Sequence, residues 1–361
     1  MKTSRIIIVV LIVVVVVVAA IYAVTVLTAA PSVCTSTWEC GAGYPVEIGG
    51  TFAIAGQQCV STASTIYCIG GQDANMGPRN DIYYTSAISS SGNVTGWTLN
   101  SQAYPQYIDG ESCVLSSGIV YCVGGSYNDN GDDVASSYYT SVTTSGSLGN
   151  WSSTTSFPIP VDSQSCVASS SYVYCVGGNN ETDGSNADST PTNSVWYAPL
   201  SASGIGKWTL TSAYPTNVLF PSCFASGNEI YCLGGADDNG NSLGTAYYAT
   251  LSSSGVSAWT STTAYPVAGS GQACVISSGD ILCVGGETSG GSNPTYTNAV
   301  YYAPISSGGI GTWKQATNYP VSVGTTCVGL SGDIYCVGGF DQSSVGLNSL
   351  VEYTSLATLM G

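Results

Sequence analysis

The sequence lacks histidine altogether and is poor in basic residues, with five lysines and arginines among 361 residues. Without histidine there is no Ser-His-Asp triad and no Cys-His pair, so these nucleophilic mechanisms are excluded. Beyond residue 5, only Arg79, Lys207 and Lys314 stand against twenty-one acidic residues, which gives this part of the chain a net charge of about −18. Such a charge repels phosphate backbones, so we exclude nucleic acid as a partner.

Charge of either sign is scarce, at 7% of residues, whereas 44% of residues are hydrophobic. That apolar content is enough to build a core, which excludes a disordered chain. Regular self-similarity along the sequence predicts one large repeat domain rather than two or three ordinary domains.

The N-terminus carries the longest apolar run. Lys2 and Arg5 precede Ile6–Ala30, which has no charged residue over 25 positions. Such a run is long enough to cross a bilayer, and the basic flank keeps the N-terminus cytoplasmic while the rest is exported. We therefore predict a signal-anchor or transmembrane segment at 1–30, a short linker at 31–36 and an exported domain at 37–361. A cleaved signal peptide ending at Thr28-Ala29-Ala30 is the alternative.

One fourteen-residue segment, QCVSTASTIYCIGG at 58–71, recurs five more times at intervals of 51 to 57 residues. Each copy has two cysteines separated by eight residues, a β-prone run before the second cysteine, and a Gly-Gly pair after it. Each copy is therefore expected to form one β-hairpin. The other copies lie at 112–125, 165–178, 222–235, 273–286 and 326–339.

The cysteine spacing fits a cross-strand disulfide. A two-residue turn at Ala63-Ser64 makes Cys59 and Cys68 a non-hydrogen-bonded pair, whose Cα atoms approach to about 4.5 Å, within disulfide reach. Structural zinc is the alternative, but paired zinc ligands usually stand closer and often include histidine. The predicted pairs indicate an oxidising, extracytoplasmic compartment. They are Cys59-Cys68, Cys113-Cys122, Cys166-Cys175, Cys223-Cys232, Cys274-Cys283 and Cys327-Cys336.

Two cysteines remain after the six hairpins. Cys34 and Cys40 are six residues apart, so a bond between them requires the chain to fold back around Trp38. We expect this local bond, Cys34-Cys40, and keep a bond to another molecule as the alternative.

Each repeat continues with two more expected strands, one rich in tyrosine and one that opens on tryptophan, so that a repeat has four antiparallel strands. The last repeat stops after its third strand, at Glu352-Tyr353-Thr354. The missing strand is found at the other end of the domain, where Trp38 precedes Tyr44-Pro45 with the usual spacing. A closed ring explains this arrangement, because the N-terminal strand then completes the last sheet and removes its exposed edge.

The Gly-Gly pair, the tyrosine-rich third strand, the tryptophan and the period near 50 resemble kelch repeats over residues 36–356. The resemblance implies an all-β, six-bladed β-propeller with four-stranded blades, preceded here by one N-terminal hydrophobic helix. The cysteine pairs and the long polar loops after Gly-Gly depart from the kelch pattern. Galactose-oxidase-like kelch enzymes bind copper through histidines, so their site cannot be assembled here. The resemblance predicts fold rather than function, because propellers host unrelated activities.

Acidic residues gather on one expected face of the propeller. The loops after the second and fourth strands hold sixteen of the twenty-one, with Arg79 as the single cation. The simplest interpretation is that Asp, Asn and Gly form solvated turns. The alternative is calcium binding, because hard oxygen ligands surround flexible glycines. The candidate ligands are Asn128, Asn130, Asp132, Asp133, Asp237, Asp238 and Asn239.

A second candidate site is the channel mouth on the same face. Two positions before the first cysteine of each hairpin stand mostly polar residues, which we expect to lean toward the channel. The channel either holds only water or binds a small polar or sugar ligand. These residues are Gln57, Glu111, Gln164, Pro221, Gln272 and Thr325.

Three functions follow from these features. The favoured one is a non-enzymatic surface protein that binds a protein, glycan or cation partner at its acidic face. The second is a glycan-active enzyme that uses carboxylates alone, with Glu111 and Asp109 as the candidate pair. The third is a structural component of the cell envelope. Three sequons also predict glycosylation, at Asn93, Asn150 and Asn180.

Overall fold

The computed structural model describes residues 34–45, 47–48, 51–52, 54–73, 77–127, 132–169, 171–180, 191–289, 294–341 and 346–360. The chain forms two compact units, Met1–Cys34 and Thr35–Gly361. The anchor predicted at Ile6–Ala30 lies outside the described residues. Among the residues that are described, none belongs to a helix long and apolar enough to span a bilayer.

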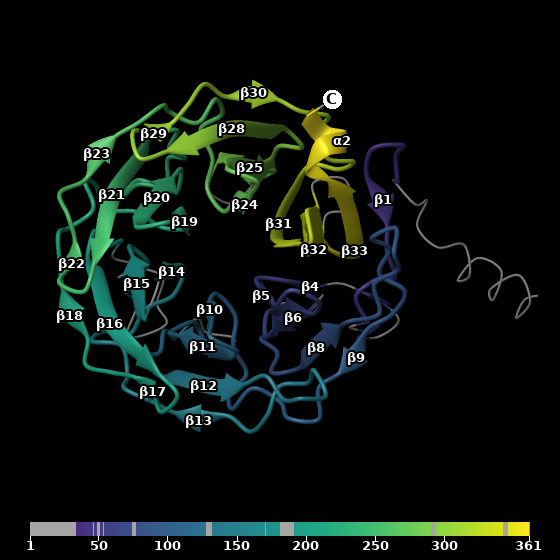
Figure 1. The fold of residues 1–361 in the computed structure, drawn as a ribbon, viewed down its shortest axis with the longest axis horizontal. Coiled ribbons are helices and arrows are strands. Elements are labelled where there is room, and N and C mark those ends of the chain that lie inside the picture. Colours follow the sequence, from purple (N-terminus) through teal and green to yellow (C-terminus); the bar gives the residue numbers. More distant parts are fainter. Residues whose placement is uncertain are drawn as a thin grey trace, which may run out of the picture. The chain divides into compact units, whose positions relative to one another are not determined.

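The second unit is a six-bladed β-propeller, as the repeats predict (Figure 1). Each blade is an antiparallel sheet whose first strand lies innermost, around the axis of the ring. Blade 1 has β5 (Gln58–Ser61), β6 (Ile66–Ile69), β8 (Ile82–Thr85) and β9 (Thr98–Leu99); blade 2 has β10 (Ser112–Ser116), β11 (Ile119–Val123), β12 (Ser137–Ser141) and β13 (Ser152–Ser153). Blade 3 has β14 (Ser165–Ser169), β15 (Tyr172–Val176), β16 (Val195–Ser201) and β18 (Thr209–Leu210); blade 4 has β19 (Ser222–Ser226), β20 (Glu229–Leu233), β21 (Ala246–Ser252) and β23 (Thr260–Ser261). Blade 5 has β24 (Ala273–Ser277), β25 (Asp280–Val284), β28 (Val300–Ser306) and β30 (Lys314–Gln315).

Blade 6 joins the two ends of the propeller chain. It contains β31 (Val323–Leu330), β32 (Asp333–Asp341) and β33 (Gly346–Ser355), and β1 (Glu39–Cys40) supplies the fourth strand. The register sets Glu39 opposite Tyr353 and Cys40 opposite Glu352. The N-terminal strand therefore closes the ring, as the position of Trp38 in the sequence predicts. Closure leaves the last blade without the exposed edge that a linear stack would have.

Short elements decorate this frame. β17 (Gly204–Ile205), β22 (Gly255–Val256) and β29 (Gly309–Ile310) extend the third strands of blades 3 to 5 into hairpins, and β26 (Glu287–Ser289) pairs with β27 (Thr295–Tyr296). β4 (Ile54–Ala55) lies between β33 and β7 (Gln72–Asp73), and β2 (Glu47–Ile48) pairs with β3 (Thr51–Phe52). A helix that the sequence did not predict, α2 (Leu356–Met360), follows β33.

The six inner hairpins form disulfides in the register that the spacing predicts. Cys59 lies opposite Cys68, and every hairpin has a Cα–Cα distance of 4.0 to 4.1 Å across its cysteines. The second cysteines are fully buried, and the first are more accessible in most blades. Cys34 and Cys40 are disulfide-bonded as well, so no cysteine is free.

The core lies between blades rather than within them. Each blade's tryptophan packs edge-to-face on an aromatic residue from the end of the preceding blade, with ring centroids 4.8 to 5.0 Å apart. These contacts bury large apolar surfaces, which is the main stabilising term for the ring. The six pairs are Trp38–Tyr319, Trp97–Tyr44, Trp151–Tyr104, Trp208–Phe157, Trp259–Tyr214 and Trp313–Tyr265.

Candidate ligand site at the axial cavity

A cavity of about 410 Å³ lies at the start of the innermost strands and is lined by residues of all six blades. Its wall includes the first cysteine of every hairpin, with Ser112, Ser165 and Ser222 beside three of them. It opens on the face of the acidic loops, because the segments that lead into the innermost strands run beside those loops. Backbone bridges between Asp109 and Ser126 and between Asp162 and Asn179 show this arrangement. The cavity has the size of a small-molecule site.

A collar of backbone hydrogen bonds surrounds the mouth of this cavity. We call the third residue before each first cysteine the collar position. The N–H groups of Gly110, Ser163, Phe220 and Gly271 each donate to the collar carbonyl of the preceding blade, at 2.9 to 3.4 Å. Five collar residues have positive φ, from 48° to 68°; Gly324 in blade 6 is the exception. The collar thus links blades 1 to 5 and is interrupted at blade 6.

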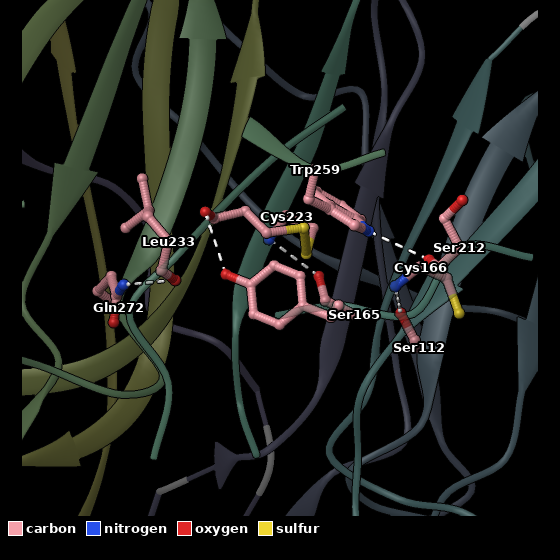
Figure 2. Close-up of a disulfide and its surroundings, with 10 residues drawn as sticks. Ser112, Ser165, Cys166, Ser212, Cys223, Leu233, Trp259 and Gln272 are labelled. Carbon is pink, nitrogen blue, oxygen red and sulfur yellow. Dashed lines mark hydrogen bonds between the residues drawn. A yellow bond between two sulfur atoms is a disulfide. The ribbon is translucent and has the colours of Figure 1, made fainter. Parts of the chain in front are cut away.

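The predicted channel residues occupy the next position, which we call the seam position because the side chains enter the interfaces between blades. Gln57, Gln164 and Gln272 are 2%, 6% and 3% exposed. Each donates through Nε2 to a carbonyl in the second strand of the preceding blade, at 2.7, 2.7 and 3.2 Å. Figure 2 shows the bond from Gln272 to Leu233. These three residues line the cavity, but their amide donors join blades and do not stand free in the channel.

The other seam positions differ. Thr325 donates to Val337 O of its own blade at 3.2 Å, and Pro221 is buried and has no donor to offer. Serine side chains reinforce two of the interfaces: Ser112 Oγ accepts from the N–H of Cys166 at 2.9 Å, and Ser165 Oγ from that of Cys223 at 3.1 Å (Figure 2).

Glu111 places a carboxyl group where blades 1, 3 and 5 place an amide. A methyl group built on Gly124 would meet Nε2 of Gln164 at 2.8 Å, and one built on Gly70 would meet Oε1 of Glu111 at 2.9 Å. Glu111 is 1% exposed, and neither of its carboxyl oxygens has a hydrogen-bond partner among the described residues. Burial raises the pKa of Glu111 well above its usual value, and Asp109 raises it further.

Asp109 lies beside this seam. It accepts a hydrogen bond from Nε2 of Gln72 at 3.3 Å, and burial raises its pKa to about 6. Glu111 lines the cavity wall, whereas Asp109 is not among the residues that line it. The structure thus keeps the two carboxyl groups of the predicted pair out of bulk solvent but does not bring both into the cavity.

The cavity also has an aromatic wall. Tyr296 and Phe340 stack with ring planes 7° apart and centroids 6.3 Å apart. Glu287 stands in the same wall, and burial raises its pKa above the usual value. Burial and the nearby Glu287 raise the pKa of Tyr296 to about 12. Phe220, at the collar, adds a third ring that is 48% exposed.

The predicted calcium ligands do not converge among the described residues. Asp237 accepts hydrogen bonds from the side-chain amide of Asn241 at 3.1 Å and from the N–H groups of Asn241 and Asn239 at 2.9 Å each. These bonds lower the pKa of Asp237 and close its own turn. Asp238 instead accepts from Asn217 at 3.2 Å. The described parts of the chain contain no cluster of three acidic, cysteine or histidine side chains suited to a metal ion. Asn128 and Asn130 lie outside them. Calcium binding at Asn128–Asp133 and at Asp237–Asn239 stays a prediction.

The single basic residue of the acidic face is neutralised locally. Arg79 donates to Asp81 through Nε at 3.0 Å and through Nη2, and it forms an ion pair with Asp73 at 3.6 Å. Within the described ranges these are the only ion pairs.

The predicted glycosylation sites differ in accessibility. Asn150 is exposed, whereas Asn93 and Asn180 are half-buried with Oδ1 atoms that are inaccessible to solvent. Their use stays a prediction.

Comparison with known proteins supports the fold and gives no information on function. No protein-family model matches the sequence, and no curated protein matches it. Among solved structures, one entitled "Structure of YjhT" is similar, with a TM-score of 0.67 and 13% sequence identity over 86% of this chain and 95% of that one. This likeness supports the propeller architecture, and the kelch assignment itself stays a prediction.

Sequence reasoning missed the aromatic wall. Phe220, Tyr296 and Phe340 come from three different blades, and two of them lie near polar loops whose lengths vary between repeats. Alignment of the collar and seam positions contained one usable signal: Phe220-Pro221 stands where other repeats have Gly or Ser followed by a polar residue.

Proposed function

We propose that this protein is a non-enzymatic, extracytoplasmic binding protein that holds a small polar ligand in its axial cavity, on the face of the acidic loops. The observation that supports this most directly is the 410 Å³ cavity, which combines a stacked aromatic wall with hydroxyl and carboxyl groups. Binding sites for small molecules typically combine apolar surface with a few placed polar groups in this way.

The charge of the cavity narrows the ligand class. Glu111 and Glu287 belong to its wall, and no lysine or arginine is among the described residues that line it. An anionic ligand would find no cation in this wall to offset the cost of its desolvation. An uncharged ligand avoids that cost.

The disulfides support the extracytoplasmic location. Bonds between paired cysteines in all six blades persist in oxidising compartments and are rare in the cytosol. Attachment to the membrane through Ile6–Ala30 is part of the proposal, and its motivation is the length of that uncharged run.

The alternative of a carboxylate-dependent glycan-active enzyme receives less support. Such an enzyme needs two carboxyl groups that flank one bond of the substrate. Glu111 is directed into an interface between blades and Asp109 does not line the cavity, so the pair does not meet this requirement in the cavity.

Ligand binding can be tested with the purified full-length protein and a plugged variant. Ala273 belongs to the cavity wall, so Ala273→Trp introduces a bulky side chain at that wall, and Leu210→Trp adds the same side chain at an exposed position, 57% accessible, on β18. Thermal shifts are measured with a panel of uncharged mono- and oligosaccharides, polyols and amino acids.

We expect at least one panel member to raise Tm for the wild type and for Leu210→Trp but not for Ala273→Trp. A ligand at a hundredfold excess over its Kd stabilises by about 2.7 kcal/mol. If no panel member produces a Tm shift that Ala273→Trp abolishes, the proposal is contradicted.

A further inference from the structure

The repeat pattern at the cavity mouth is broken twice in blade 4. The collar position holds glycine in blades 1, 2, 5 and 6 and serine in blade 3, but Phe220 in blade 4. The seam position that follows it is polar in every other blade, and in blade 4 it is Pro221. Two adjacent departures from a rule that five repeats obey are typical of functional sites.

Phe220 is held in a backbone conformation that suits glycine. Its φ is 48°, in the left-handed region, and residues before proline are further restricted. Two backbone bonds fix it there: its N–H donates to Ser163 O at 2.9 Å, and its carbonyl accepts from the N–H of Gly271 at 3.1 Å. Glycine would make both bonds without strain. Backbone strain of this kind in a bulky residue, retained in one repeat, points to a role for the side chain.

The side chain itself does not contribute to the core. Phe220 is 48% exposed, although phenylalanine usually becomes buried, and it lines the cavity mouth. An exposed ring on a strained backbone at the edge of a cavity presents an apolar face to a ligand that enters the cavity. The same cavity offers Tyr296 and Phe340 as a second apolar surface and the carboxylate of Glu287 as an acceptor.

We propose that the ligand of the axial cavity is an uncharged saccharide, whose apolar ring face stacks on Phe220 while its hydroxyl groups bond to Glu287 and the serine-lined wall. This inference rests on the proposed function. A saccharide matches the site because it combines an apolar C–H face with many hydroxyl donors, and the cavity provides aromatic rings and acceptors without a cation. Acyclic polyols offer the same hydroxyl groups without a ring face, which distinguishes the two classes.

The test compares Phe220→Gly, Phe220→Trp and the wild type as full-length proteins. Phe220→Gly removes the ring and the strain together, so we expect Tm to rise by about 2 °C while affinity for the saccharides of the panel falls about tenfold or more. Ser163→Gly relaxes the same backbone conformation, with φ of 57°, in the neighbouring blade and serves as the reference for the rise in Tm. Phe220→Trp should keep saccharide binding, measured by isothermal titration calorimetry.

The outcomes separate this inference from the proposed function. Binding that Ala273→Trp abolishes but Phe220→Gly leaves unchanged, or binding of acyclic polyols or amino acids in place of saccharides, would overturn the inference and leave the proposed function standing. A lower Tm in Phe220→Gly with unchanged binding would assign the ring a structural role and would also overturn it. A wild type that binds no panel member would overturn both.

Discussion

Two neighbouring interfaces of the propeller differ in the side chain at the seam position. Between blades 2 and 3, Gln164 donates to Val123 O at 2.7 Å; between blades 1 and 2, Glu111 places a carboxyl oxygen at the equivalent point. The backbone is the same in both: a Gly-Gly pair with positive φ precedes a third strand, and the second glycine donates to the incoming segment of the next blade at 2.8 and 2.9 Å.

This difference shows how the protonation state of a side chain can affect the stability of the propeller. An amide can donate at any pH, whereas a carboxyl group donates only when it carries its proton. The raised pKa of Glu111 is the expected response of a buried acid beside Asp109, with Tyr104 and Tyr44 as neutral neighbours that its charge also reaches. The stability of the interface between blades 1 and 2 is therefore expected to vary with pH through Glu111, whereas Gln164 gives the interface between blades 2 and 3 no such dependence.

The largest loss of stability is expected from a substitution in the backbone that both interfaces share. A Cβ atom on Gly124 would lie 2.3 Å from Val161 O, so Gly124→Ala should lower the free energy of unfolding by about 3 kcal/mol or more. Gly118 is the control, because it has a similar φ of 76° and open space around it, and Gly118→Ala should cost about 1 kcal/mol. Urea unfolding measures both; equal losses would show that the interface does not require glycine there.

Converting the glutamine interface into a glutamate interface should have the next largest effect. Gln164→Glu at pH 7 removes a donor from a buried carbonyl, which costs about 2 kcal/mol. Burial should raise the pKa of the new carboxyl, so its folded form binds a proton more tightly than its unfolded form. Stability then falls as pH rises above the unfolded pKa.

Urea unfolding of Gln164→Glu at pH 4 and pH 7 measures this dependence, with Gln102→Glu, at an exposed position, as the control. A loss for Gln164→Glu that is the same at both pH values would contradict the proton-dependent interface.

The reverse exchange, of glutamate for glutamine, should remove a pH dependence of stability that the wild type already has. The folded pKa of Glu111 is raised, so between its unfolded and folded pKa values the native state alone holds the proton, and stability declines with rising pH by about 1.4 kcal/mol per unit. Glu111→Gln should match the wild type at pH 4 and exceed it by about 1 kcal/mol at pH 7, because a permanent donor replaces the carboxyl. Calorimetric Tm at both pH values tests this; a Glu111→Gln protein that is less stable at pH 7 would show that the carboxyl group has a native partner of another kind.

The contrast between these interfaces also marks what the sequence can predict. Hairpins, disulfide pairs and ring closure follow from local spacing, because cysteines nine positions apart across a two-residue turn can meet in only one register, and Trp38 identifies the missing strand. The seam residues line the cavity, and their role in ligand binding stays a prediction. The direction of their side chains was not predictable, because an inner-strand side chain can point along the channel or into the next blade, and packing between blades decides.

Tertiary context also explains the missed aromatic wall. Phe340 directly follows a Gly-Gly pair, whereas Tyr296 belongs to the polar loop of blade 5, and their stacking depends on how blades 5 and 6 meet. No local periodicity reports such a contact. Phe220 is different, since its violation of the collar pattern is visible once the six repeats are aligned.

The smallest effect is expected at the outer aromatic contact of the same two interfaces. Tyr104 packs on Trp151 between blades 1 and 2, and Phe157 packs on Trp208 between blades 2 and 3. The hydroxyl of Tyr104 is buried and has no hydrogen-bond partner among the described residues, so phenylalanine at the equivalent position loses nothing by lacking it. Tyr104→Phe should therefore change the free energy of unfolding by no more than about 0.5 kcal/mol, and in the stabilising direction, because a desolvated hydroxyl is removed while the edge-to-face contact remains.

The converse variant, Phe157→Tyr, should lower the free energy of unfolding by about 1 kcal/mol, because it buries an unsatisfied hydroxyl. Urea unfolding of both variants decides the point: a Tyr104→Phe loss above 1 kcal/mol would mean that this hydroxyl bonds to a buried water or to the carboxyl of Glu111.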